Sequence, residues 1–332
     1  MRLTTRQLLG LATLLVVVLA VCVLRLLIDR NLDGHVSLAW PAKQWATYRW
    51  TAMIIGVIVG ASLGTSGTLL QALLRNPLAE PFILGLSSGA GLGVMVMLYI
   101  AYRLPSQMGG LHTDIRTIPA IIGALAVLAI VYGLGQRRGW LDPVSLVLVG
   151  VIISTMCGAG IMFVQHLVPT GLRGEFTTWL MGYIPETADQ WEVITISAIL
   201  IAGLVFSMIL GGAMDAATLG DDEARSVGVS VGFLRLVLFV VAGALGAVSV
   251  ALAGPIGFVG LVGPHAARLI VGPRHRSLIP AAAMMGIVLI VGADVFRQAI
   301  DLGAGRMPIG VFTAIIGGPV FIWLLLTERG QS

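Results

Sequence analysis

Long apolar segments recur along the whole chain, and they constrain its fold more than any other feature of the sequence. A helix needs about 20 mostly apolar residues to cross the hydrocarbon core of a membrane. Ten such segments occur, at residues 7–28, 50–73, 86–102, 116–135, 144–168, 191–211, 234–253, 258–272, 279–300 and 309–326. Because backbone polar groups in lipid must bond within their own segment, these segments are expected to be helices. The sequence therefore predicts an all-α integral membrane protein with about ten transmembrane helices, of which the eighth is short.

The composition excludes an ordinary soluble domain. Hydrophobic residues make up 57% of the sequence and charged residues 11%, whereas soluble domains carry about 25% charged residues. The formal net charge of +4 is small and there is no basic run, so nucleic acid is not an expected partner. Membrane lipid is the expected surrounding of the chain.

The lysine content limits how the chain could use ATP. A P-loop needs a lysine that follows glycine and reaches the nucleotide phosphates. The sequence has a single lysine, Lys43, and alanine precedes it. The chain is therefore not expected to be an enzyme, and an ATP-driven function requires a separate subunit. No cofactor and no metal site are expected, because His265, Cys22 and Cys157 lack partners at ligand spacing.

The N-terminal segment and the loop arginines bear on topology. Arg2 and Arg6 precede the first apolar run, as in a signal peptide, but the run is long and no small-residue cleavage site follows. We therefore expect residues 7–28 to form a membrane span. An even number of spans places both termini on one side. If that side is the cytoplasm, the inner loops carry slightly more arginine than the outer loops, which is the expected bias.

Two segments interrupt the apolar pattern. Residues 75–81 contain two prolines after the second span, which predicts a helix stop at the membrane interface. Residues 254–265 contain two prolines and four glycines within an apolar stretch. Non-helical backbone at membrane depth is tolerated only where protein or water surrounds it. We therefore expect residues 254–265 to be buried between helices or to line a cavity.

These motifs resemble those of the FecCD-type permease family. They read GTLLQALLRNPLAEPFILGLSSG from Gly67, GPIGFVGLVGPHAARLIVGPRHR from Gly254, and PIGVFTAIIGGPVFIWLLL from Pro308. They follow in the family's order over nearly the whole chain. The resemblance implies a type II ABC importer permease fold, with residues 1–332 as one transmembrane domain in the bacterial inner (cytoplasmic) membrane.

The family resemblance also implies a function and partners. Its members import iron-siderophores, haem and cobalamin, so the expected cargo is a metal chelate. Two copies of the permease form the pathway as a homodimer, two ABC ATPase subunits bind on the cytoplasmic side, and a periplasmic substrate-binding protein delivers the cargo.

Three groups of residues match functional segments of the family. The cytoplasmic loop 214–228 matches the segment whose two short helices dock into the ATPase. Its coupling residues are Leu219, Gly220, Asp221, Asp222, Glu223, Arg225 and Gly228. Arg49 and Arg297 match arginines at the periplasmic rim that bind acidic residues of the binding protein. The residues matching the cytoplasmic gate are Asp142, Pro143, Val144 and Ser145.

Simpler interpretations exist for each group. The acidic loop is also typical of a solvated loop, and Asp142 with Pro143 is typical of a helix start. Asp294 and Arg297 are spaced to pair on one helix face. The sequence departs from the family at Ala46, where an arginine is usual, and at Arg306-Met307-Pro308, where a glutamate is usual.

Other functional classes fit the sequence less well. An ion-coupled secondary transporter, the main alternative, would need acidic carriers within the membrane, and only Asp294 clearly qualifies. An intramembrane enzyme would need a paired nucleophile and base, which the spans lack. The sequence does not name the chelate. Weakly polar residues that could line its path are Ser62, Thr65, Ser66, Ser87, Ser88 and Gly89.

Overall fold

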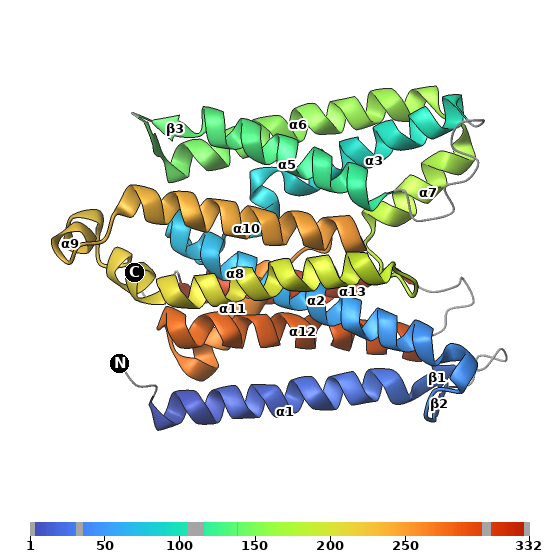
Figure 1. Cartoon of the computed structure of the whole chain (residues 1–332), viewed down its shortest axis with the longest axis horizontal. Coiled ribbons are helices and arrows are strands. Elements are labelled where there is room, and N and C mark those ends of the chain that lie inside the picture. Colours follow the sequence, from blue (N-terminus) through green and yellow to red (C-terminus); the bar gives the residue numbers. More distant parts are fainter. Residues whose placement is uncertain (1–3, 31–35, 105–115, 138, 301–306, 329–332) are drawn as a thin grey trace.

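The fold is a bundle of long helices that run side by side (Figure 1). The computed structural model describes residues 4–30, 36–104, 116–137, 139–300 and 307–328. The helices are α1 (Thr5–Leu27), α2 (Lys43–Leu74), η1 (Pro81–Leu84), α3 (Leu86–Arg103), α5 (Thr117–Leu134), α6 (Pro143–Leu167), α7 (Thr170–Leu180), α8 (Gln190–Ala217), α9 (Asp221–Ser226), α10 (Val231–Ala253), α11 (Val259–Val271), α12 (His275–Ala299) and α13 (Ile309–Glu328). The strands form two antiparallel hairpins, β1 (Ile28–Arg30) with β2 (Val36–Leu38), and β3 (Gln136–Arg137) with β4 (Trp140–Leu141).

The two ends of the bundle carry different elements (Figure 1). One end, called the α9 end below, carries α9, the β3–β4 hairpin and the start of α1. The opposite end, called the hairpin end, carries the β1–β2 hairpin and α7. Helix α13 finishes on the same side as the start of α1 (Figure 1). Both ends of the described chain therefore lie on one side, as an even number of spans requires.

Ten apolar helices correspond to the ten predicted spans. Eight described helices are long and apolar enough to cross a membrane, namely α1, α2, α3, α5, α6, α8, α10 and α12. Two shorter apolar helices complete the set, α11 and the Ile309–Ile322 part of α13. The all-α prediction is thus confirmed. Helix α7 lies between the predicted spans 144–168 and 191–211, where no span was predicted.

Helix α11 is too short to cross the hydrocarbon core alone. Its 13 residues give a length of about 20 Å, against a core of about 30 Å. The irregular segment 254–258 precedes it, and Phe258 has a φ of 68°. The start of α11 lies inside the bundle, because Gly260 approaches Pro81 and the backbone of α2. Residues 259–264 are all buried, which confirms that this broken segment lies between helices.

Helix α2 is the central helix, with 89% of its apolar window buried. Small residues allow its backbone to approach α12. A Cβ added at Gly60 would overlap the carbonyl of Gly286, and one added at Gly64 would overlap the carbonyl of Ala282. Lipid supplies little hydrophobic drive for helix association, so close backbone packing of this kind holds the two helices together.

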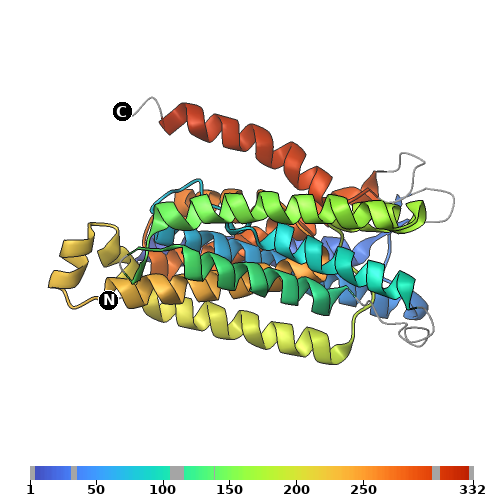
Figure 2. The same ribbon diagram turned by 90° about the horizontal axis from the view of Figure 1, so that it is seen from above.

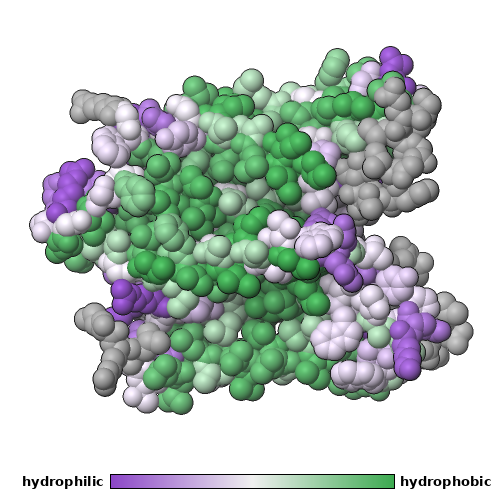
Figure 3. All heavy atoms as spheres, in the orientation of Figure 1, coloured by the Kyte–Doolittle hydropathy of each residue, from purple (hydrophilic) through white to green (hydrophobic). Residues whose placement is uncertain are grey.

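The face drawn in Figure 3 is apolar around the middle and polar at both ends. Large exposed hydrophobic side chains occur on α1, α5, α6 and α8, where they suit contact with lipid. Near the hairpin end, exposed tryptophans include Trp40, Trp45 and Trp50. Such aromatic residues are typical of the membrane–water interface. Helix α13 begins against the bundle and then diverges from it (Figure 2).

Candidate functional site

The predicted coupling loop forms a short helix at the tip of the α9 end. Helix α8 continues to Ala217, a turn follows, and α9 spans Asp221–Ser226. Gly220 and Gly228 bracket α9 with φ values of 149° and 84°, a region in which glycine is favoured. The resemblance implied two short helices, but in the structure the first half of the loop extends α8, so that α9 is the single separate helix there.

Helix α9 presents different faces to the bundle and to its exterior. Ala224 is fully buried against the bundle, whereas Leu219 and Val227 are 77% and 68% exposed. The first turn carries the acids Asp221, Asp222 and Glu223, whose charge suits the positive end of the helix dipole. Two exposed apolar side chains therefore flank an acidic turn on the outermost part of this end.

Asp221 anchors α9 to two long helices. Its carboxylate forms ion pairs with Arg75, which caps the end of α2, and with Arg235, near the start of α10. The Arg235 Nη2 atom lies 2.9 Å from Asp221 Oδ2. Asp222 pairs with Arg225 on the exposed face at 3.1 Å, where screening by water leaves such a pair worth at most about 1 kcal/mol.

Asp215, another acid of the predicted loop, belongs to α8 and caps α12. Its Oδ1 atom accepts hydrogen bonds from the His275 backbone N–H at 2.9 Å and lies 2.7 Å from His275 Nδ1. The carboxylate thus satisfies donors at the start of α12. The end of α8 is fixed to α12 before the chain turns into α9.

The predicted gate residues form the start of α6. The Asp142 side chain accepts hydrogen bonds from the Ser145 N–H (2.9 Å) and hydroxyl (2.7 Å), and Pro143 occupies the first turn. These hydrogen bonds lower the pKa of Asp142. The helix-start interpretation is therefore confirmed for Asp142 and Pro143. Val144 is 66% exposed, so its side chain points away from the bundle.

Arg235 joins the predicted gate to α9. While its Nη2 atom binds Asp221, its Nη1 atom donates to the Leu141 carbonyl at 3.3 Å. An opening of about 350 Å³ lies beside it, lined by Arg137, Trp140, Leu141, Asp142 and Arg235. Arg235 was not among the predicted site residues. An arginine one turn into an apolar helix is the signal that could have found it.

A buried charge cluster lies at the hairpin end. Asp294 on α12 binds Arg25 on α1, and its Oδ1 atom accepts from Arg297 Nε at 2.8 Å. The side chains of Arg25, Asp294 and Arg297 are 1%, 1% and 6% exposed. Arg297 was expected at the rim. It lies at the expected end, but its guanidinium is buried against Asp294, as the helical spacing allowed.

Arg49 lies near this cluster and caps α1. Its Nη1 atom donates to the carbonyls of Leu26 and Ile28 at 3.2 and 3.1 Å, and its side chain is half-buried. Arg25, Arg49 and Arg297 thus gather near Asp294. Arg25 was not predicted as a site residue, because it lies within the first predicted span. Arg306 lies outside the described residues.

Glu80 is a second acidic residue inside the bundle. Its Oε2 atom accepts a hydrogen bond from the Phe258 N–H at 3.3 Å, at the start of α11, where the helix dipole favours a carboxylate. Residues 75–81 were predicted to lie at the membrane interface. The chain instead turns back into the bundle after α2, since Pro81 contacts Gly260.

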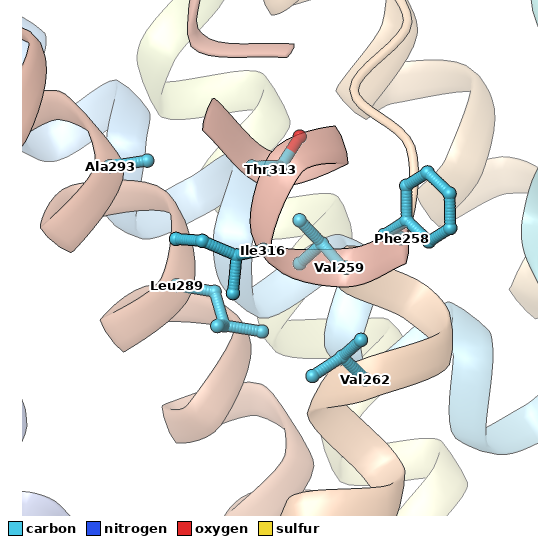
Figure 4. Close-up of a pocket in the computed structure, with 8 residues that line it drawn as sticks. Phe258, Val259, Val262, Leu289, Ala293, Thr313 and Ile316 are labelled. Atoms are coloured by element: carbon cyan, nitrogen blue, oxygen red, sulfur yellow. The ribbon is translucent and has the colours of Figure 1, made fainter. Parts of the chain in front are cut away.

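The residues suggested as pore walls are mostly enclosed. Ser62, Thr65 and Ser66 are fully buried between α2 and its neighbours, so that expectation was wrong for them in this arrangement. A small cavity between α11, α12 and α13 has a volume of about 20 Å³ and an apolar lining that includes Phe258 and Leu289 (Figure 4). A water needs about 10–15 Å³, so this cavity cannot hold a chelate.

The fold, the lipid-facing surface and the polar ends define a class of protein: a multi-pass membrane protein. The FecCD transport family matches residues 9–327, and the chain belongs to this family. It is 34% identical to the hemin transport system permease protein HmuU of Yersinia pestis over 288 residues, which cover 86% of this chain and 84% of that protein. It is 36% identical to the vitamin B12 import system permease protein BtuC of Klebsiella pneumoniae over 277 residues, covering 83% and 80%.

Two further comparisons agree. The Fe(3+)-citrate import system permease protein YfmD of Bacillus subtilis is 35% identical over 285 residues, covering 86% of this chain and 81% of that protein. A solved structure of a metal-chelate type ABC transporter in an inward-facing conformation has a TM-score of 0.81 at 27% identity, covering 96% and 99% of the two chains. This chain is therefore the permease component of an ABC importer of the cytoplasmic membrane. It works with ATPase and binding-protein partners and is not an ion-coupled transporter.

Proposed function

We propose that this permease imports a metal chelate of the class that includes haem, cobalamin and ferric citrate. The observation that carries the proposal is the match to permeases of all three systems over 83–86% of the chain. Calorimetry on the cognate binding protein with hemin, cyanocobalamin and ferric citrate tests it, followed by uptake into vesicles that contain permease and ATPase. Binding of none of the three classes would contradict the proposal.

We further infer that the permease acts as a homodimer with the pathway between two copies. The central helix α2 is packed by its neighbours, and the apolar groove between α3, α5 and α6 is unsuited to a polar chelate. Helix α13 diverges from the bundle (Figure 2) and exposes Ile315 and Ile322 at 63% and 59%, an apolar face that a second copy can cover. Native mass measurement of the transport-competent complex tests this, and a competent monomer contradicts it.

Helix α9 and its flanking residues are proposed to couple the ATPase to the pathway. Leu219 and Val227 project from α9 and suit an apolar groove on a partner, while Asp221 connects α9 to α2 and α10. Replacing Leu219 and Val227 together by aspartate is expected to abolish ATPase association and transport. Ser230→Asp is the matched control, since it adds a charge beside α9 without removing an apolar side chain. Transport at the wild-type rate in the double variant would refute the coupling role.

The arginines of the hairpin end are proposed to face the binding protein. Arg49 is the more accessible of the two matched residues, whereas Arg297 contributes charge from a buried position. Arg49 is half-buried at the end of α1, so its charge can attract acidic side chains of a partner.

A further inference from the structure

One side chain, Arg235, contacts both the coupling helix and the segment that leads into the gate. Its Nη2 atom lies 2.9 Å from Asp221 Oδ2 and 3.2 Å from Asp221 Oδ1. Its Nη1 atom donates to the Leu141 carbonyl at 3.3 Å. Leu141 directly precedes Asp142, the N-cap of α6. The path from α9 to the first turn of α6 thus runs through one guanidinium.

The chemistry of this contact requires arginine. A guanidinium presents its N–H donors in a rigid planar fork, so that Asp221 and the Leu141 carbonyl are bound by the same rigid group. A lysine carries its donors on one nitrogen at the end of a flexible stem. It can keep the charge pair with Asp221, but it cannot hold the carboxylate and the carbonyl at a fixed separation.

Arg235 lies beside a packed tryptophan and an opening. The Trp140 ring packs across Gly232 on α10, because a Cβ at Gly232 would overlap it. The opening of about 350 Å³ is lined by both Trp140 and Arg235. The Arg235 side chain is 20% exposed, so it is partly shielded from water while retaining space to move. Asp221 also holds Arg75, which ties the end of α2 to the same carboxylate.

We propose that Arg235 is a positioning residue that transmits displacement of α9 to the start of α6. The inference rests on the proposed coupling role of α9 and on the gate that the family resemblance predicts at residues 142–145. When the ATPase moves α9, Asp221 moves with it, and Arg235 carries that movement to the carbonyl preceding Asp142.

The test uses the complete complex of permease, ATPase and binding protein in vesicles. Arg235→Lys is the informative variant, because it keeps the charge and loses the fork. The substrate taken up and the ATP hydrolysed are measured in the same vesicles. ATPase association and the rate of hydrolysis should stay within about twofold of wild type, while uptake per ATP falls about tenfold, as expected for losing a hydrogen bond to a charged group. Arg137→Lys, which lines the same opening, should keep the wild-type ratio.

A second pair of variants keeps the proposal testable if Arg235→Lys does not fold. Asp221→Asn removes the other half of the contact, and Asp221→Asn combined with Arg235→Gln should be no worse than either single change. A wild-type ratio of uptake to ATP in Arg235→Lys overturns the proposal. Loss of ATPase association in that variant also overturns it, because Arg235 would then act in docking.

The coupling role of α9 can be refuted independently of the positioning role of Arg235. It fails if the Leu219 and Val227 double variant still binds the ATPase and transports normally. If that double variant loses ATPase association as expected while Arg235→Lys keeps the wild-type uptake per ATP, only the proposed role of Arg235 is wrong.

Discussion

Replacing Asp294 by asparagine is expected to destabilise the protein more than removing either of its arginine partners. Asp294 neutralises Arg25 and Arg297, whose side chains are 1% and 6% exposed. Asp294→Asn leaves two buried guanidiniums without a carboxylate, and stranding a buried charge costs about 3–5 kcal/mol. Arg25→Met removes one charge and leaves Asp294 paired with Arg297 at 2.8 Å, so we expect a cost of about 1–2 kcal/mol.

Thermal unfolding in detergent with a thiol-reactive fluorescent dye measures this difference. Cys157 is buried and Cys22 half-buried, so both thiols gain access to the dye as the helices separate. Because such unfolding is commonly irreversible, the apparent Tm values of all variants are compared at one heating rate. The expected order of Tm is wild type, then Arg25→Met, then Asp294→Asn.

A matched control separates the charge effect from a general loss of packing. Arg173→Met removes an arginine that donates to the Val168 carbonyl at 3.0 Å outside the cluster, and it should shift the Tm little. The reasoning is refuted if Asp294→Asn is as stable as wild type. It is also refuted if Arg25→Met is the more damaging change.

Three further predictions address the other sites. Arg49→Glu should slow association with the binding protein at low salt, by an amount that shrinks as salt rises, because accessible charges act mainly on the association rate; equal rates at low salt would count against docking. Asp142→Ala should lower stability by about 0.5–2 kcal/mol through loss of the N-cap, whereas Asp142→Asn should be nearly neutral in the same unfolding assay. Hydrogen bonds from Ser145 lower the pKa of Asp142. The stabilisation from its ionised carboxylate is therefore fully present above the unfolded-state pKa and is lost only as the pH falls through the lowered folded-state pKa. The titration of Asp142 should therefore leave the free energy of unfolding unchanged between pH 5 and pH 8. Gly64→Val should prevent assembly of the bundle, because the Cβ position meets the Ala282 carbonyl, and a folded, active variant would show that α2 and α12 can separate.

The helices and the class of protein followed from the sequence because their signals are local. Apolar runs of about 20 residues and the need to satisfy backbone groups within lipid predict spans without any knowledge of neighbours. The family resemblance also predicted short helices in the loop 214–228, and the structure has one separate helix there, α9 (Asp221–Ser226). The eighth span, predicted as short over residues 258–272, is α11 (Val259–Val271).

The candidate sites depended on contacts between distant residues, which the sequence pattern did not reveal. Arg25 and Asp294 are 269 positions apart, and Arg235 and Leu141 are 94 apart. Arg25 looked like one polar residue within an apolar span, and Arg297 looked like a rim residue until Asp294 and α1 enclosed it. Ser62, Thr65 and Ser66 looked suited to a pore wall, but α2 proved to be the central helix.

The sequence by itself determined that the chain is a membrane bundle of the FecCD type without its own P-loop, because hydropathy and motif identity are properties of consecutive residues. Only the tertiary structure decided which charges are buried, which arginine binds which acid, and that α9 meets the start of α6 through Arg235. The chain crosses the membrane several times between the two partners of such a contact. The partners therefore lie far apart in the sequence.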